Sequence, residues 1–145
     1  MPPDPLMATH VLRRSGQRPL RFQGDAVHRA CWHFAAEADG IFLGLYQQAG
    51  HGLVVEMGCV PPRAAFAVAW HDAVTAADLA AAVACLESAE PFCAPAFLGE
   101  ADTLAGLRAA ALRLCLRDGL RCAFRHAVGA FLYDLCALDL TRAAL

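Results

Sequence analysis

Histidine and cysteine side chains gather in one short stretch of the chain, where they could bind a transition metal. His28, Cys31 and His33 fall within six residues. Imidazole and thiolate are ligands that Zn²⁺ prefers, and His51 or Cys59 could supply a fourth. The spacing His-x2-Cys-x-His matches no established zinc finger or ribbon. These three residues are the candidate metal site, and a half-buried cysteine beside two solvent-exposed histidines is the alternative interpretation.

The sequence gives weaker evidence for acid–base or nucleophilic catalysis than for a metal site. Cysteine and histidine are both plentiful, but no spacing specifies a nucleophilic pair. Glu56 interrupts an apolar run, and we interpret it as a carboxylate on an edge strand, with a general acid or base as the alternative. His71 and Asp72 suit a turn, and His51 lies at an expected hairpin tip. No catalytic residue and no cofactor is therefore predicted, apart from zinc at the cluster.

The amino-acid composition excludes several classes of enzyme. The chain has 145 residues and no lysine, so a P-loop, a Schiff-base lysine and a kinase-type ATP site are excluded. Ser15 and Ser88 both lie outside a G-x-S-x-G motif, which argues against a serine hydrolase. The composition therefore favours a protein without enzymatic activity.

Charge and hydropathy indicate the kind of partner. The net charge of −2 attracts neither nucleic acid nor anionic lipid. Arg13, Arg14, Arg18 and Arg21 cluster locally, and a nucleic-acid-associated regulator is an alternative that rests on them. Hydrophobic residues make up 58% of the chain, more than one small core requires. We therefore expect a protein partner or, more simply, a homodimer.

The expected location is the cytoplasm of a bacterium. The first residues lack the basic start and the apolar run of a secretory signal, although Met7 rather than Met1 could be the true start. No stretch is long and apolar enough to span a bilayer. Lysine and asparagine are absent and Ile41 is the only isoleucine, which indicates a GC-rich genome.

A change of hydrophobic period near the middle of the chain predicts an α+β fold. We expect a flexible arm over residues 1–17 and a single α+β domain over 18–145. Alternating or short apolar runs bounded by Gly and Pro predict an antiparallel sheet of three to four strands. The clearest part is a hairpin over 41–60, with other strands at 18–24 and 65–70. Two apolar faces on this hairpin would need two layers of cover, and a second copy of the chain could supply one of them.

The second half of the chain predicts helices. Thr75 and Asp78 resemble a capping box that opens a helix over 76–88. In the C-terminal third, one continuous helix would place Arg113 and Arg117 on the same side as Phe124. Breaking the helix at Asp118 and Gly119 removes that conflict and predicts a C-terminal αα-hairpin. The first helix would then bury Leu104, Leu107, Ala111 and Leu114, and the second Leu120, Phe124, Ala127, Phe131, Leu135 and Leu138.

The seven cysteines include no C-x-x-C pair. Without a signal peptide we expect them to be reduced, and those within the helical patterns to be small buried apolar groups.

Short motifs occur over residues 18 to about 57: Arg18-Pro19-Leu20-Arg21-Phe22-Gln23-Gly24, Leu45-Tyr46, Gly50-His51-Gly52 and Val54-Val55. In these motifs the chain resembles small uncharacterised bacterial proteins of the EXLDI type. Leu138-Asp139-Leu140 is similar to that family's Leu-Asp-Ile, but Cys136 stands where its Glu should be. These motifs mark strand ends and a turn and imply no activity. We therefore expect a small regulatory or protein–protein interaction module, with a metal protein or enzyme using His28, Cys31 and His33 as the alternative.

Overall fold

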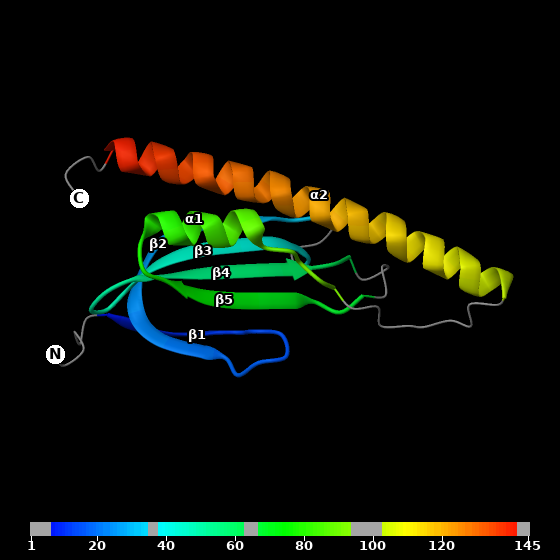
Figure 1. Cartoon of the computed structure of the whole chain (residues 1–145), viewed down its shortest axis with the longest axis horizontal. Helices are drawn as coiled ribbons and strands as arrows, with labels where there is room; N and C mark the ends of the chain where they lie inside the picture. Colours follow the sequence, from blue (N-terminus) through cyan, green and yellow to red (C-terminus); the bar gives the residue numbers. More distant parts are fainter. Residues whose placement is uncertain (1–6, 35–37, 63–66, 94–102, 142–145) are drawn as a thin grey trace.

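The computed structural model describes residues 7–34, 38–62, 67–93 and 103–141. In the described residues, five antiparallel strands form one sheet in the order β1-β2-β3-β4-β5, and two helices follow (Figure 1). The predicted α+β class is confirmed, with five strands rather than three to four. Residues 8–12, expected in the arm, form a strand of the sheet. The elements are β1 (Ala8–Leu12), β2 (Leu20–Trp32), β3 (Gly40–Gln48), β4 (Leu53–Val60), β5 (Trp70–Ala76), α1 (Leu79–Ser88) and α2 (Leu104–Thr141).

The hairpin of β3 and β4 is confirmed, with Tyr46 paired to Val54 and Gly44 to Glu56. Gly50 and Gly52 in its turn have φ angles of 92° and 94°. These angles lie in the left-handed region, which glycine adopts without a steric penalty. Alternation along the strands predicts Leu43 and Val55 on one face and Tyr46 and Val54 on the other. The structure confirms this, because the first two lie in one buried core and the last two in another.

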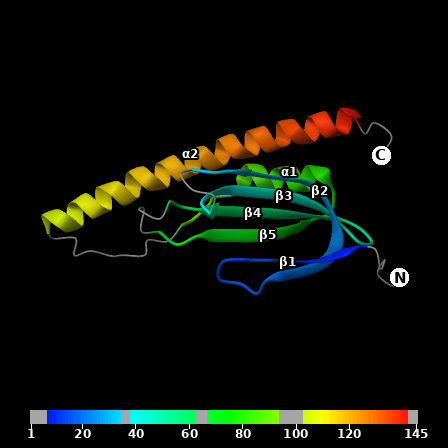
Figure 2. The same ribbon diagram turned by 180° about the vertical axis from the view of Figure 1, so that it is seen from behind.

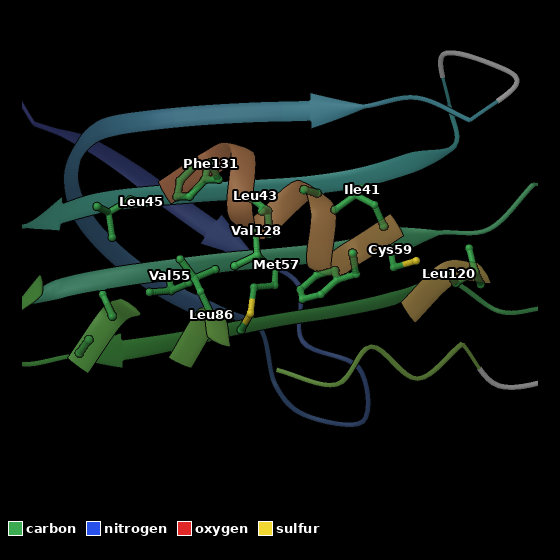
Figure 3. Close-up of a cluster of buried hydrophobic side chains, with 14 residues drawn as sticks. Ile41, Leu43, Leu45, Val55, Met57, Cys59, Leu86, Leu120, Val128 and Phe131 are labelled. Atoms are coloured by element: carbon green, nitrogen blue, oxygen red, sulfur yellow. The ribbon is translucent and has the colours of Figure 1, made fainter. Parts of the chain in front are cut away.

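Both helices cover one face of the sheet (Figures 1 and 2). We call this the helix-covered face, and Figure 3 shows its buried side chains. Strand side chains on this face pack against the helices, and those at the centre of the face are almost fully buried. The main members of this core are Ile41, Leu43, Leu45, Val55, Met57, Cys59, Leu86, Phe124, Val128 and Phe131.

The opposite face, which we call the inner face, is covered in part by the chain itself. β2 curves so strongly that β1 and the first part of β2 lie on the other side of β3, β4 and β5 from the helices (Figures 1 and 2). A second, smaller core lies there, made of Leu12, Phe22, Tyr46, Val54 and Ala73. The curled sheet thus supplies cover for the second apolar face of the β3–β4 hairpin, which we expected a second copy of the chain to cover. The two apolar faces of the hairpin therefore no longer argue for a dimer.

Local features of β2 accompany this curl. The register between β2 and β3 shifts between Ala26 and His28, as at a β-bulge, which bends a strand and increases its twist. At Gly24, a Cβ atom would lie 2.2 Å from the carbonyl oxygen of Gln47. Only glycine permits so close an approach of the two backbones.

β5 and α1 lie slightly later in the chain than predicted. The strand expected over 65–70 begins at Trp70 and continues to Ala76, so His71 and Asp72 are strand residues rather than a turn. Of the expected strand, residues 65 and 66 fall outside the described residues. The N-cap of α1 is Asp78 rather than Thr75, since its carboxylate accepts a 2.8 Å hydrogen bond from the backbone N–H of Ala81.

The predicted αα-hairpin is wrong, because α2 is one helix of 38 residues. Its C-terminal part lies over the sheet, whereas its N-terminal part extends past the end of the sheet (Figure 1). The extended part does not have to bury the side of the helix that carries Arg113 and Arg117, so the conflict behind the predicted break does not arise. Leu120, Phe124, Ala127 and Phe131 are buried as expected, but Leu104, Leu107 and Leu114 are 66%, 59% and 63% exposed.

Candidate functional site

A cluster of polar side chains lies on the inner face at the middle of the sheet. The strand register places Arg29 of β2 and Glu56 of β4 on either side of Gly44 in β3. Two residues after Glu56 on β4, Gly58 pairs with His71 of β5. Side chains from three strands are therefore brought to one region of the inner face, although they are far apart in sequence.

Glu56 is held by a hydrogen bond within this cluster. The Tyr46 hydroxyl donates to its Oε2 atom at 2.5 Å. Burial raises the pKa of Tyr46 well above its ordinary value of about 10, and the hydrogen bond and the negative charge of Glu56 raise it further. The Arg29 guanidinium opposes this rise. Tyr46 is therefore a protonated donor at neutral pH, and Glu56 is the acceptor.

Two glycines make room for the polar side chains. A Cβ at Gly44 would lie 3.1 Å from Cε2 of Tyr46 and 3.2 Å from Oε2 of Glu56. A Cβ at Gly58 would lie 3.1 Å from Nδ1 of His71. Glycine inside a strand costs roughly 0.5–1 kcal/mol relative to alanine. Here it allows the carboxylate and the imidazole to lie close to the sheet backbone.

His71 is attached to the turn between β1 and β2. Its backbone N–H donates to the hydroxyl of Ser15 at 2.9 Å, and its carbonyl oxygen accepts from the backbone N–H of Ser15 at 2.7 Å. Burial lowers the pKa of His71, as does the positive charge of Arg13, while Glu56 opposes both effects. The imidazole is therefore neutral at pH 7.

These side chains line a pocket of about 420 Å³. That volume falls within the roughly 300–1,000 Å³ typical of small-molecule sites. The pocket presents a guanidinium as donor, a carboxylate as acceptor and a neutral imidazole beside apolar surface. Its lining includes Arg29, Cys31, Phe42, Glu56, Val60 and His71.

The structure does not bring the three metal-site candidates together. The ring of His28 faces α2, where it stacks on Phe131 with 5.0 Å between ring centroids and its Nε2 lies 3.4 Å from Asp134 Oδ2. Cys31 and His33 lie together, with 3.4 Å between Sγ and Nε2. In the described part of the chain, no group of three His, Cys, Asp or Glu residues is placed to hold a metal ion.

The remaining single candidates have different settings. His51 is exposed in the β3–β4 turn, and Cys59 is buried in the helix-covered core. The edge-strand interpretation of Glu56 is wrong, because β4 pairs with β3 on one side and β5 on the other. The carboxylate instead belongs to the pocket.

The N-terminal arginines lie at and beside the turn between β1 and β2. Arg14 Nε donates to the carbonyl oxygen of Arg18 at 2.7 Å, which closes this turn. Arg13 acts on His71 through its charge. Arg21 is exposed on β2.

The cysteines are free in the structure, and three of the helical ones are not buried. Cys115, Cys122 and Cys136 are exposed on α2, because the helix is covered by the sheet on one side only. Cys85 is partly buried, and Cys59 is the fully buried thiol.

Sequence reasoning missed Arg29, Tyr46 and His71 as members of the site. Alternation in the hairpin did place Tyr46 and Phe42 on one face, which was a usable signal. The side on which Arg29 lies depends on the bulge in β2, and no residue pattern marks that bulge. The sequence predicts a turn at His71, and a turn residue has no assigned face of the sheet.

No family model, curated protein or solved structure matches the chain. The resemblance to EXLDI-type proteins stays a prediction. Among the described residues, neither helix is both long and apolar enough to cross a bilayer.

Proposed function

We propose that this protein is a non-enzymatic protein–protein interaction module that forms a homodimer through the extended part of α2. The observation that carries the proposal is the exposure of leucines on that part. Leu104, Leu107 and Leu114 are each more than half exposed although they are large and apolar. Exposed apolar patches of this kind mark interaction surfaces.

The leucines lie on one side of the helix. At about 100° per residue, Leu104, Leu107, Ala111 and Leu114 fall within an arc of about 80°. We call these four residues the leucine stripe. Their spacing of three and four residues is that of the a and d positions of a coiled coil. The stripe is self-complementary, so two antiparallel copies can bury it in a closed symmetric dimer.

Sedimentation equilibrium at micromolar concentration tests the proposal. The wild-type chain should have about twice its monomer mass of 15.4 kDa. The double variant Leu107→Glu/Leu114→Glu should be a monomer, because it places four carboxylates in the interface. Leu112→Glu is the matched control, since Leu112 is 71% exposed on the same helix but lies outside the stripe. This control should remain a dimer, and a wild-type monomer would contradict the proposal.

A second candidate partner is an acidic amphipathic helix. Arg108 and Arg117 flank the stripe at the e and g positions, where charged residues set the choice of partner in coiled coils. A monomeric wild type would favour this partner. Binding of a synthetic Leu- and Glu-rich helical peptide, weakened by Leu107→Glu but not by Leu112→Glu, would then support it.

A further inference from the structure

The pocket on the inner face holds two opposite charges that do not form an ion pair with each other. Arg29 is exposed at the rim, and among the described residues it pairs with no carboxylate. Glu56 is half-buried, and its Oε2 is taken by Tyr46. Its Oε1 accepts no hydrogen bond from any described residue. Arg29 acts on the Tyr46 hydroxyl, but a guanidinium carries five N–H donors, so it can still donate to a ligand, and Glu56 Oε1 can accept.

The two charges lie close to each other. Arg29 and Glu56 both pair with Gly44 in the strand register, and Arg29 also acts on the Tyr46 hydroxyl, through its charge and through a hydrogen bond. The Glu56 carboxylate also lies close to Gly44, which is on β3 between β2 and β4. A ligand that bridges Arg29 and Glu56 must therefore carry its own two charges a short distance apart.

We propose that this pocket binds a free α-amino acid with an apolar side chain. The carboxylate of the ligand pairs with Arg29, in the bidentate geometry that guanidinium favours. The ammonium group donates to Glu56 Oε1 in the half-buried part of the pocket. The ring of Phe42 and the side chain of Val60 take the apolar side chain.

Ligands with a single charge fit less well. A ligand with only a negative charge would leave Glu56 unpaired and would be repelled by it. A ligand with only a positive charge would leave Arg29 unpaired and would be repelled by it. His71 adds no charge at pH 7, because its pKa is lowered by burial and by Arg13. A zwitterion is the charge class that satisfies both ends of the pocket at once.

The probe for this proposal is L-leucine, measured by isothermal titration calorimetry against two analogues. 4-Methylpentanoate lacks the amine, and 3-methylbutylamine lacks the carboxylate. L-Leucine should bind saturably, and each analogue should bind at least about tenfold more weakly, since a hydrogen bond to a charged group contributes about 1.5–3 kcal/mol. No binding of L-leucine, or equal binding of 4-methylpentanoate, would overturn the proposal.

Variants locate the binding in the pocket. Glu56→Gln keeps an acceptor for Tyr46 but removes the charge, and Arg29→Gln removes the guanidinium. Each should raise the Kd of L-leucine by about tenfold or more. The controls are Glu87→Gln on α1 and Arg21→Gln on β2, both exposed outside the pocket, and they should bind as the wild type does. Wild-type affinity in both pocket variants would show that the ligand binds elsewhere and contradict the proposal.

Two further measurements distinguish loss of ligand binding from unfolding and from loss of the dimer. Circular dichroism and the thermal midpoint of each variant show whether it is folded. The variant Leu107→Glu/Leu114→Glu should bind L-leucine with wild-type affinity, because the leucine stripe lies outside the pocket. The pocket and the dimer can therefore fail or succeed independently.

Discussion

The hydroxyl of Tyr46 on β3 donates a 2.5 Å hydrogen bond to Oε2 of Glu56 on β4, on the inner face of the curled sheet. Tyr46 is 1% exposed, so its ring belongs to the smaller core while its hydroxyl holds Glu56, which lines the pocket. One residue thus connects the packing of the inner face with the charge that we assign to ligand binding. Removing its hydroxyl has consequences that depend on pH.

Tyr46→Phe should change how stability depends on alkaline pH. The pKa of Tyr46 is raised in the folded protein, so above about pH 10 the unfolded chain loses this proton while the folded chain keeps it. The contribution of Tyr46 to the free energy of unfolding is fully present below about pH 10. It falls as pH rises further, by at most about 1.4 kcal/mol per pH unit. Urea unfolding between pH 8 and 11 should show a shallower decline in Tyr46→Phe. The control Tyr133→Phe removes a tyrosine that is 76% exposed and should keep the wild-type slope.

At pH 7, Tyr46→Phe should also lower the free energy of unfolding by about 1–3 kcal/mol, because Glu56 loses its donor. A variant as stable as the wild type at pH 7, with an unchanged alkaline slope, would contradict the role given to this hydrogen bond.

His71→Gln should change the dependence on acidic pH. The pKa of His71 is lowered in the folded protein, first by burial and then by Arg13. The unfolded chain therefore takes up a proton as pH falls below about 6.5, before the folded chain does. The contribution to stability is present above pH 6.5 and is lost as pH falls. His71→Gln should have a shallower loss between pH 6.5 and 5, whereas His51→Gln in the exposed turn should follow the wild type.

Gly119→Ala should stabilise the protein by about 0.5–1 kcal/mol, because alanine is the better helix former. Gly119 lies inside α2, its φ is not positive, and an added Cβ would meet nothing within 4 Å. Gly129→Ala is a matched control in the same helix with the same open surroundings. Chemical denaturation measures both. A loss of stability confined to Gly119→Ala would indicate a break at this residue and restore the αα-hairpin.

The seven thiols should react at very different rates with a thiol reagent under native conditions. Cys31, Cys115, Cys122 and Cys136 are exposed and should be labelled first. Cys59 should be labelled last, because it is buried and because the neighbouring Cys93 thiol and burial both raise its pKa. Mass spectrometry of the labelled peptides gives the order. In denaturant the differences should disappear, and native labelling of Cys59 as fast as Cys115 would argue against the packing of β4.

The hairpin of β3 and β4 was predictable from the residues alone. Strict alternation assigns Ile41 and Leu43 to one face and Tyr46 to the other, and Gly50 and Gly52 mark the reversal. Alternation and turn chemistry are local properties, so they are visible in the sequence. The α+β class follows from the same kind of local signal.

The course of α2 depended on tertiary structure. Helical periodicity shows which side of a helix is apolar, but it does not show where the neighbouring sheet ends. The inferred break at Gly119 assumed that every apolar side is covered, whereas Leu104 and Leu107 lie on a part of the helix that extends past the sheet. The length of helix that the sheet covers is set by the sheet, so no pattern within residues 104–141 could show it.

The candidate site depended on tertiary structure for the same reason. The sequence itself determined that Glu56 is a lone carboxylate within an apolar strand and that it faces away from Val55 and Met57. Only the folded sheet brought Arg29 and His71 beside it. Strand register, the shift in β2 and the attachment of Ser15 to His71 create this neighbourhood. Each is a long-range contact whose free energy comes from packing the whole sheet, so the residues that meet in the pocket carry no mark of it in their local sequence.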